Sequence, residues 1–265
     1  MPDLQCSTPN VQRSTFNVQR FIDASALRSV WPDFVGTAVY ASIVNSQYNP
    51  ALWQEIEAFI ADYRQRYTVD SIKEMPAIQA TREAYKRCGK DPSRYRPSSE
   101  ALVRRTLQGK DLYQVNTVVD LINLASIAYG YSIGGFDADK IETKIKDKRL
   151  EIKDKVTSES NLNSYLLSHS SYLSLGIGRE GEPYEGIGRG PLNIAGLPVY
   201  RDAIGGIGTP TSDHERTKLS LESTHLLAIV NGYDGNRQNT NACAQFIQEL
   251  LRKYAESDGG TIFEF

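Results

Sequence analysis

The chain has 265 residues, of which 40% are hydrophobic and 23% are charged, and its formal net charge is -2. This is an ordinary globular composition, and the length can bury a core as one large domain or two small ones; we expect one compact unit. No run approaches the roughly eighteen apolar residues that span a bilayer, and the N-terminus lacks the basic-then-apolar layout of a secretory signal. We therefore expect a soluble, cytoplasmic protein with no membrane partner.

The cysteines argue against a disulfide-bonded or zinc-binding protein. The three cysteines, Cys6, Cys88 and Cys243, are an odd number at wide spacing. This pattern suits neither a disulfide framework nor a zinc site. We expect reduced thiols, no bound metal and no cofactor.

The first elements are a strand and two helices. Residues 1–20 are interpreted as a polar tail or an added strand. The stretch "FVGTAVYASIVN", which begins at Phe34, is β-branched and uncharged, as a buried strand would be. Apolar residues then recur at helical spacing over 52–63, which predicts an amphipathic helix. A second helix is predicted over 77–87, closed by Gly89 at its C-terminal cap.

Residues 82–110 hold a segregated positive charge. They carry nine Lys or Arg against three Asp or Glu, so the segment is six charges positive within a slightly acidic chain. Arginines clustered among Tyr85 and Tyr95 suit a phosphate backbone with stacking bases; the alternative is a solvated face. The residues predicted to bind RNA are Arg94, Arg96, Arg104, Arg105 and Lys110.

The same segment contains a helix. After a proline-containing turn, Ser98 is expected to cap a helix that runs to Leu107 and stops at Gly109. Glu100 lies in the first turn, where the positive end of the helix favours an acid. Arg104 follows Glu100 by four residues and lies within its reach. Some of the positive charge is therefore predicted to be structural.

The middle of the chain is strongly apolar. Residues 116–130 carry apolar side chains almost all round and predict a buried helix or strand that Gly130 ends. Asp120 and Asn123 lie one helical turn apart inside it, and buried polar groups need partners. A serine-rich stretch near 156–174 is interpreted as a loop insertion.

The second half changes character. Residues 176–223 are dense in Gly, Pro and Thr with short apolar runs, which predicts strands joined by tight turns. Residues 224–233 predict a further strand, and the spacing of apolar residues up to Tyr254 predicts a C-terminal amphipathic helix. Helices mainly in the first half and antiparallel or mixed strands mainly in the second indicate an α+β fold. We expect a single domain over 21–265.

Three motifs, taken in order, resemble a known family. They are "GKDPSRYRPSSEALVRRTLQGK" at 89–110, "VNTVVDLINLASIAYGYSIGGFDADKI" at 115–141 and "YRDAIGGIGTPTSDHERTKLSLEST" at 200–224. Together they are similar to the B3/B4 domain of the phenylalanyl-tRNA synthetase β subunit, with the closest likeness to free-standing B3/B4 proteins. The resemblance covers roughly residues 81–231, and the ordered set is more specific than any one motif. No synthetase catalytic module is visible, so we do not expect the chain to charge tRNA.

The resemblance implies a site and a partner. In the synthetase this module houses the editing pocket in which tyrosine mistakenly attached to the tRNA is hydrolysed. The implied partner is a tRNA or the 3′ end of an aminoacyl-tRNA, and no DNA is expected. The implied substrate-binding residues are Asn123, the pair Gly205 and Gly206, and Glu222, which resembles the glutamate that contacts the tyrosine hydroxyl. Gly134 stands where the synthetase segment usually has a histidine.

Three functions remain open. The chain could be a free-standing hydrolase that acts in trans on mischarged tRNA, a non-catalytic RNA-binding module that retains the fold, or an amino-acid-binding pocket that no longer binds RNA. The basic segment favours the two RNA functions, and the missing histidine favours binding over catalysis. Each site residue also has a structural alternative: Glu222 can pair with a surface cation, Asp120 and Asn123 can cross-link the core, and His214 can lie in a surface turn.

Overall fold

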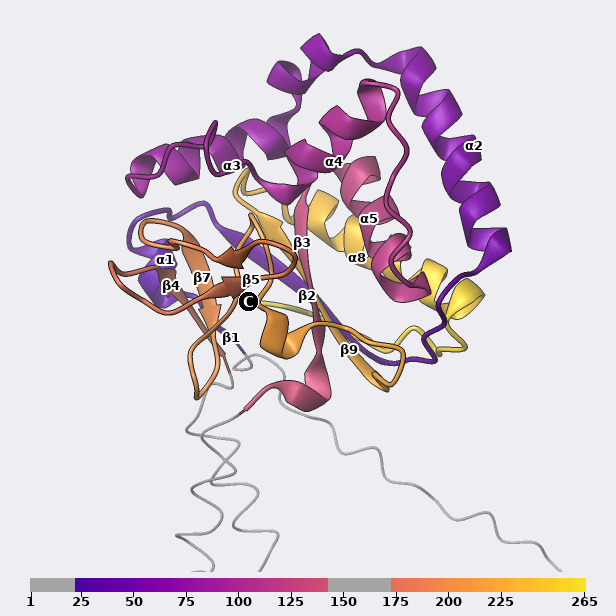
Figure 1. Cartoon of the computed structure of the whole chain (residues 1–265). Coiled ribbons are helices and arrows are strands. Elements are labelled where there is room, and N and C mark those ends of the chain that lie inside the picture. The colour runs from indigo at the N-terminus through magenta and orange to yellow at the C-terminus, as the bar shows by residue number, and fades with distance from the viewer. Residues whose placement is uncertain (1–21, 143–172) are drawn as a thin grey trace, which may run out of the picture.

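The structure is a computed structural model that describes residues 22–142 and 173–265 (Figure 1). The predicted tail over 1–20 and most of the predicted insertion near 156–174 lie outside the described residues. The last two residues of that insertion correct the prediction, because they begin strand β4 (Leu173–Ile177). Leu173 pairs with Ile22, and Ser174 pairs with Arg201, so backbone pairing on both sides makes this end of the segment a strand.

The larger of the two main sheets has four antiparallel strands. Their order is β10 (Thr261–Glu264), β2 (Val35–Ser42), β9 (His225–Gly232) and β3 (Ser132–Asp137). The central neighbours β2 and β9 are the strands predicted from the runs at 34–45 and 224–233, and both are confirmed. Strands β3 and β10 were not predicted, because β3 contains two glycines and β10 has only four residues.

Helices cover one face of this sheet (Figure 1). The helices of this layer are α2 (Pro50–Arg66), η2 (Val69–Glu74), α3 (Pro76–Arg87), α4 (Ser98–Leu107), α5 (Thr117–Tyr129) and α8 (Arg237–Tyr254). Helix α1 (Ser25–Arg28) contacts β4 instead, and the short helices η3 (Ala138–Lys140) and η4 (Glu215–Thr217) contact each other outside the layer. Alternate residues of β9, namely Leu226, Ala228 and Val230, pack in one apolar core with α2, α5 and α8. Burying this face is the main stabilising contribution to such a layer.

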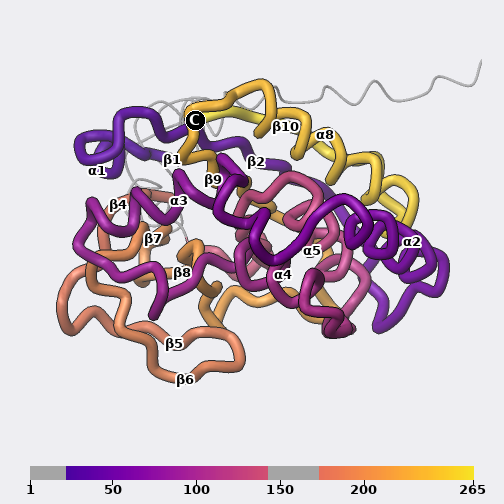
Figure 2. The backbone as a smooth tube through the Cα atoms, turned by 90° about the horizontal axis from the view of Figure 1, so that it is seen from above, coloured from indigo at the N-terminus to yellow at the C-terminus, as the bar shows by residue number. Residues whose placement is uncertain are grey.

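A smaller sheet packs on the other face. Its order is β1 (Ile22–Asp23), β4, β7 (Pro198–Arg201) and β8 (Gly206–Gly208), with β1 and β4 parallel and the remaining pairs antiparallel. The other alternate residues of β9, Leu227 and Ile229, share a second core with Leu175 and Ile207 of this sheet. The hairpin of β5 (Glu185–Gly186) and β6 (Gly190–Pro191) lies at the edge of the molecule, away from α8 (Figure 2).

The predicted fold class is confirmed. The helices lie mostly in the first half and the strands mostly in the second, so the protein is α+β. Gly109 and Gly130 end α4 and α5 with positive φ angles of 74° and 76°, a conformation that glycine adopts without steric cost. The predicted cap at Ser98 is wrong. The helix already includes Ser98, whose side chain makes no capping hydrogen bond and whose N–H donates to Pro210 O instead.

Neither a membrane-spanning helix nor a metal-binding cluster is found among the described residues. None of the helices within 22–142 and 173–265 combines the length and the apolar character that a membrane crossing requires. In the same ranges, Cys88 and Cys243 are free thiols, and no cluster of His, Cys, Asp and Glu is arranged to hold a metal ion.

Candidate functional site

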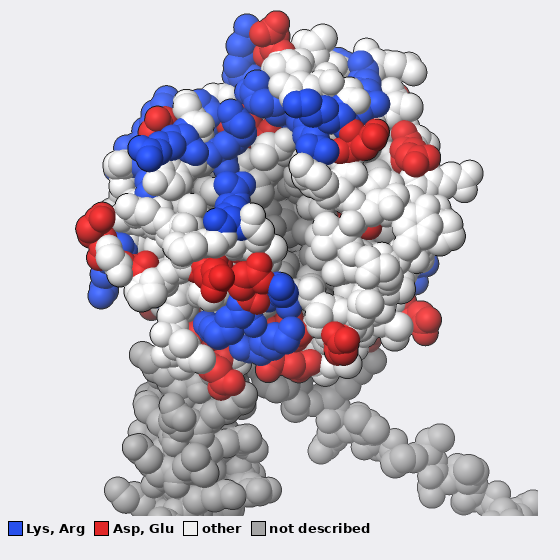
Figure 3. Space-filling view, viewed as in Figure 1, with Lys and Arg blue, Asp and Glu red and all other residues white. Residues whose placement is uncertain are grey.

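One face of the molecule combines a basic surface with a hollow. In the space-filling view, Lys and Arg side chains gather over the region of α3 and α4 (Figure 3). A hollow lies between the α3 side and the α5 side of this face, and the first half of β3 runs behind it in the same view (Figure 1). The predicted RNA-binding segment and strand β3, which belongs to the second B3/B4-like motif, therefore lie on the same face.

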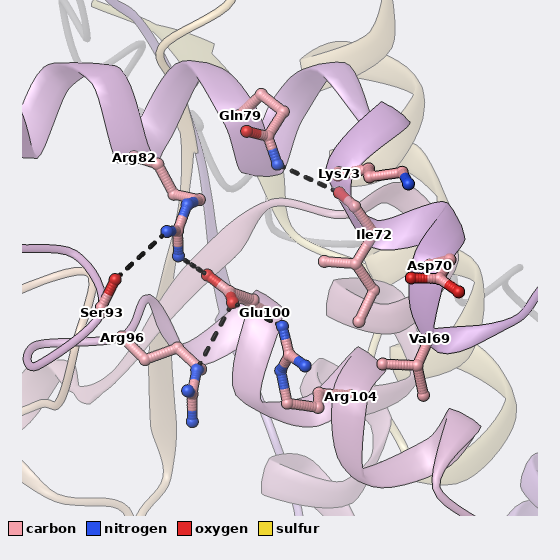
Figure 4. A pocket seen from close by; sticks show the side chains of 10 residues that line it. All are labelled: Val69, Asp70, Ile72, Lys73, Gln79, Arg82, Ser93, Arg96, Glu100 and Arg104. Atoms are coloured by element: carbon pink, nitrogen blue, oxygen red, sulfur yellow. Dashed lines mark hydrogen bonds and ion pairs between the residues drawn. The ribbon is translucent and has the colours of Figure 1, made fainter.

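The basic surface is organised around one enclosed acid, Glu100, whose side chain is 2% exposed. Arg82 Nη1 lies 2.7 Å from its Oε2, and Arg104 Nη2 and Arg96 Nε lie 3.2 and 3.4 Å from its Oε1 (Figure 4). The predicted contact between Glu100 and Arg104 is confirmed. The contacts from Arg82 and Arg96 were not predicted. Two of the five predicted RNA-binding residues, Arg96 and Arg104, thus also hold the protein together.

The other three predicted RNA-binding residues have different surroundings. Arg105 donates to Asp111 O and to Tyr113 Oη, and its guanidinium lies 3.9 Å from the Tyr113 ring centre. Arg94 and Lys110 are exposed at the surface. These positions are compatible with contact to a phosphate backbone, and RNA binding by the five residues stays a prediction.

The two tyrosines of this segment differ. Tyr85 is fully buried and its hydroxyl is 2.9 Å from Thr211 Oγ1, so it is not available to stack on a base and that suggestion is wrong. The ring of Tyr95 is partly exposed and lies 3.7 Å from Lys90 Nζ. Lys90 in turn donates to the carbonyls of Asn193 and Ala195. A cation–π contact therefore fixes the loop before α4.

A second enclosed acid, Asp213, lies between β3 and β8. Its Oδ2 accepts a 2.9 Å hydrogen bond from Gly135 N–H, and it forms a backbone bridge with Gly208. The residue is partly exposed, but its carboxyl group is enclosed, and burial raises the pKa of Asp213 to about 7 although the Gly135 hydrogen bond acts in the opposite direction. A carboxyl group that changes its protonation near neutral pH can act as a general acid or base.

Glycines make room for this arrangement. A Cβ at Gly134 would lie 2.6 Å from the Phe136 ring, and one at Gly208 would lie 2.4 Å from the same ring and 3.0 Å from Asp213 Oδ1. The space beside Gly134, where the synthetase segment usually has a histidine, is therefore filled by Phe136. A histidine at this position would require the ring to move.

The predicted substrate-binding residues lie on three elements. Asn123 is half-buried on α5, Glu222 is exposed in the turn before β9, and Gly205 and Gly206 lie where β7 turns into β8. A hydrogen bond to Ser220 lowers the pKa of Glu222. Within the described ranges, no hydrogen bond or ion pair joins these residues to one another, and their shared role stays a prediction.

One side chain links two of these elements. Asn45 Nδ2 donates to Ser220 O, and Asn45 Oδ1 accepts from Val118 N–H at the start of α5. The turn of Glu222 is thereby tied to the helix that carries Asn123. Gly205 N–H donates to Asp202 Oδ1 in the smaller sheet.

The remaining candidates have structural partners. Asp120 is buried and accepts hydrogen bonds from Trp53 Nε1 at 2.8 Å and Val115 N–H at 3.0 Å, while burial raises its pKa. This supports the interpretation of Asp120 as a core cross-link. His214 Nδ1 accepts from Arg216 N–H and caps η4, and burial lowers the pKa of His214.

Sequence reasoning missed Asp213. It lies within the third motif, next to His214, and its partner Gly135 lies in the second motif, 78 residues earlier. The signal that could have identified it is the glycine at both 134 and 208, because small residues on strands of two neighbouring sheets leave room for a side chain between them.

Together these features describe an α+β domain with a large helix-covered sheet, a smaller sheet behind it and a basic face beside a hollow. The family model of the B3/4 domain matches residues 80–256. The chain therefore belongs to the B3/4 domain family. The matched span begins in α3 and ends just beyond α8, so the central strand β2 lies outside it.

The other two comparisons are less informative. No curated protein matches the chain. Among solved structures, it is similar to the crystal structure of an N-terminal fragment of the phenylalanyl-tRNA synthetase β subunit from Pyrococcus horikoshii, with 11% identity and a TM-score of 0.40. The alignment covers 92% of this chain and 52% of that one, so the chain spans about half the length of the fragment.

Proposed function

We propose that this protein binds the 3′ end of aminoacylated tRNA and hydrolyses the ester of a mischarged amino acid in trans, with Asp213 as the general base. The observation that carries the proposal is the Asp213 carboxyl, enclosed beside Gly134 and Gly135 with a pKa of about 7. Membership of the B3/4 family and the basic face over α3 and α4 support an RNA substrate.

In the proposed reaction the proton that leaves the water molecule ends on the ribose oxygen, so no other reactant is needed. The ionised Asp213 carboxyl removes a proton from a water molecule, whose oxygen adds to the ester carbonyl carbon. The bond to the ribose oxygen then breaks, and that oxygen takes back a proton, which releases the amino acid and the free tRNA end. Gly135 N–H is already bonded to Asp213. It therefore orients the base and leaves oxyanion stabilisation to other donors.

A second candidate is a non-catalytic RNA-binding module. The observation that favours it is the Phe136 ring, which fills the space beside Gly134 where the synthetase segment usually has a histidine. In this case the same face binds RNA, and the enclosed Asp213 only shapes the fold. An amino-acid-binding pocket without RNA is the third function, and the basic face argues against it.

A deacylation assay with several mischarged tRNAs, tyrosine on a phenylalanine tRNA among them, separates the three. Under the hydrolase proposal, Asp213→Asn lowers the rate by about 100-fold or more, the usual share of a general base. The wild-type rate should also rise as pH increases through about 7, because the base must be ionised. The matched control is Asp62→Asn, an exposed carboxyl on α2, which should leave the rate unchanged.

The outcomes are distinct. Saturable tRNA binding without deacylation of any ester would replace the hydrolase with the non-catalytic module. Amino-acid binding without tRNA binding would favour the third function. Deacylation that Asp213→Asn leaves intact would remove Asp213 from the proposal. Glu222→Ala in the same assay tests whether Glu222 distinguishes a tyrosyl from a phenylalanyl ester.

A further inference from the structure

Glu100 and the three arginines that contact it, Arg82, Arg96 and Arg104, form the Glu100 cluster. This cluster is one wall of a pocket of about 340 Å³ between η2, α3 and α4. Four cations line it, Lys73, Arg82, Arg96 and Arg104, and only two carboxylates, Asp70 and Glu100. The lining is therefore two charges positive. Figure 4 shows the three guanidinium groups gathered around Glu100 on one side of the pocket.

The guanidinium groups offer more donors than Glu100 can use. Each arginine carries five N–H donors, whereas one carboxylate accepts only about four hydrogen bonds. Arg104 Nε is also buried and has no hydrogen-bond partner, one of three such side-chain atoms within the described ranges. A buried donor without an acceptor is unfavourable, because it has lost its water and gained nothing in return.

An anion with several oxygens would use the guanidinium donors that Glu100 leaves without an acceptor. A terminal phosphate carries a charge of about -1.5 to -2 at neutral pH and three strong acceptor oxygens. A guanidinium group can bind phosphate with two parallel hydrogen bonds. The charge of such a group matches the excess positive charge of the lining.

The opposite side of the pocket carries two aliphatic residues among polar ones. Val69 and Ile72 of η2 face the arginines across the pocket (Figure 4). The volume is within the range of small-molecule pockets and leaves room beside a phosphate for an organic group. A ligand with a phosphate at one end and a less polar body at the other therefore fits both sides.

We propose that this pocket binds a terminal phosphate monoester, with Arg96 and Arg104 as its principal ligands and Arg82 positioned by Glu100 behind them. The phosphate can belong to a free nucleotide or to the phosphorylated 5′ end of an RNA. The inference goes beyond the proposed function, because it requires neither Asp213 nor an aminoacyl ester.

Titration calorimetry on the full chain tests the pocket with four probes: AMP, adenosine, and one short RNA with either a 5′-phosphate or a 5′-hydroxyl. AMP should bind and adenosine should bind at least about tenfold more weakly, since charged hydrogen bonds dominate. Preference for the 5′-phosphorylated RNA over both AMP and the 5′-hydroxyl RNA identifies an RNA end as the source, and preference for AMP identifies a free nucleotide.

Variants locate the site. Arg96→Gln should weaken AMP binding by about tenfold or more, and Arg104→Lys should weaken it although the charge is kept, because the fork of donors is lost. Lys86→Gln is the matched control: it removes one cation from α3, where Lys86 pairs with Glu83 at the surface, and should change affinity less than about twofold. Arg96 is 42% exposed, so its replacement should leave the fold intact, as circular dichroism can check.

Two results would overturn the inference: no saturable binding of AMP or inorganic phosphate up to about 10 mM, or an equal loss of affinity in Lys86→Gln and Arg96→Gln. Both are independent of the deacylation assay. A protein that deacylates tRNA without binding AMP refutes this pocket alone. A protein that binds AMP in this pocket but neither binds nor deacylates tRNA refutes the proposed function alone.

Discussion

Glu100 and Asp213 are both enclosed carboxyl groups, but their partners differ completely. Three guanidinium groups surround Glu100, two of them on its own helix or just before it. The hydrogen bond to the Asp213 carboxylate comes from the uncharged N–H of Gly135, and burial raises the pKa of this acid to about 7. A buried acid with cations beside it forms ion pairs, whereas a buried acid without such a cation has a raised pKa, although a backbone N–H that donates to it acts in the opposite direction.

This difference separates two kinds of site within one face. The Glu100 cluster fixes α3, α4 and the loop between them, and its excess positive charge is available to an anion. Asp213, with a pKa of about 7, can gain or lose a proton near neutral pH. The first is suited to binding and the second to acid–base chemistry.

The largest expected effect concerns Asp213. Its pKa of about 7 in the folded state lies above the ordinary value of 3.8, so folding favours the protonated acid. The stability from this group is fully present below pH 3.8 and is lost as pH rises through about 7. A shift of this size corresponds to at most roughly 4 kcal/mol. Urea unfolding between pH 4.5 and 8 should therefore show a loss of stability that Asp213→Asn abolishes.

Asp62→Asn, the exposed control on α2, should keep the wild-type pH profile. Parallel profiles for wild type and Asp213→Asn would contradict the contrast between the two acids, because Asp213 would then be ionised in the folded state at neutral pH.

The next effect concerns Glu100. Glu100→Gln leaves three guanidinium groups together without their shared carboxylate, and removing one partner of a buried pair costs about 3–5 kcal/mol. We expect about 3 kcal/mol, the lower end, because the arginines are partly exposed. Equilibrium urea unfolding at pH 7 measures it. Glu83→Gln breaks the exposed pair with Lys86 and should cost less than about 1 kcal/mol. Equal costs for the two variants would make the cluster an ordinary surface network.

Two glycine substitutions test how tightly the Asp213 site is packed. Gly134→Ala places a methyl group 2.6 Å from the Phe136 ring and should destabilise the fold by about 1–3 kcal/mol through overpacking. Gly205→Ala is the matched control, because a Cβ there meets no atom within 4 Å. Phe136→Leu should recover part of the loss in a double-mutant cycle. A harmless Gly134→Ala would show that the ring moves freely, and that a histidine could be accommodated.

The smallest effect on stability is expected for exposed cations outside the Glu100 cluster. Arg94→Gln with Lys110→Gln should change the free energy of unfolding by less than about 0.5 kcal/mol. If these residues contact RNA, the slope of log affinity against log salt should decrease by about one for each lost phosphate contact. Filter binding of tRNA at several salt concentrations measures the slope. Arg66→Gln with Arg237→Gln, two cations in exposed pairs elsewhere, should leave it unchanged.

Local sequence determined the main elements and one contact of the Glu100 cluster. The spacing of apolar residues predicts α2 and α8, whereas the apolar run at 116–130 left helix or strand open and forms α5; positive φ angles at Gly109 and Gly130 end helices where the sequence places these glycines. Arg104 follows Glu100 by four residues, which one helical turn brings together, so their contact could be read directly. The ordered motifs also identified the family that the B3/4 model matches.

The long-range contacts of Glu100 and Asp213 were decided only by the tertiary structure. Arg82 reaches Glu100 across 18 residues and Gly135 reaches Asp213 across 78, and no periodicity in the chain encodes such approaches. Strand β3 was not predicted because its glycines carry no strand signal; its pairing with β9 supplies the hydrogen bonds that make it a strand. Charge and spacing are local properties, whereas burial depends on which distant segments pack together, and burial sets the pKa of Asp213.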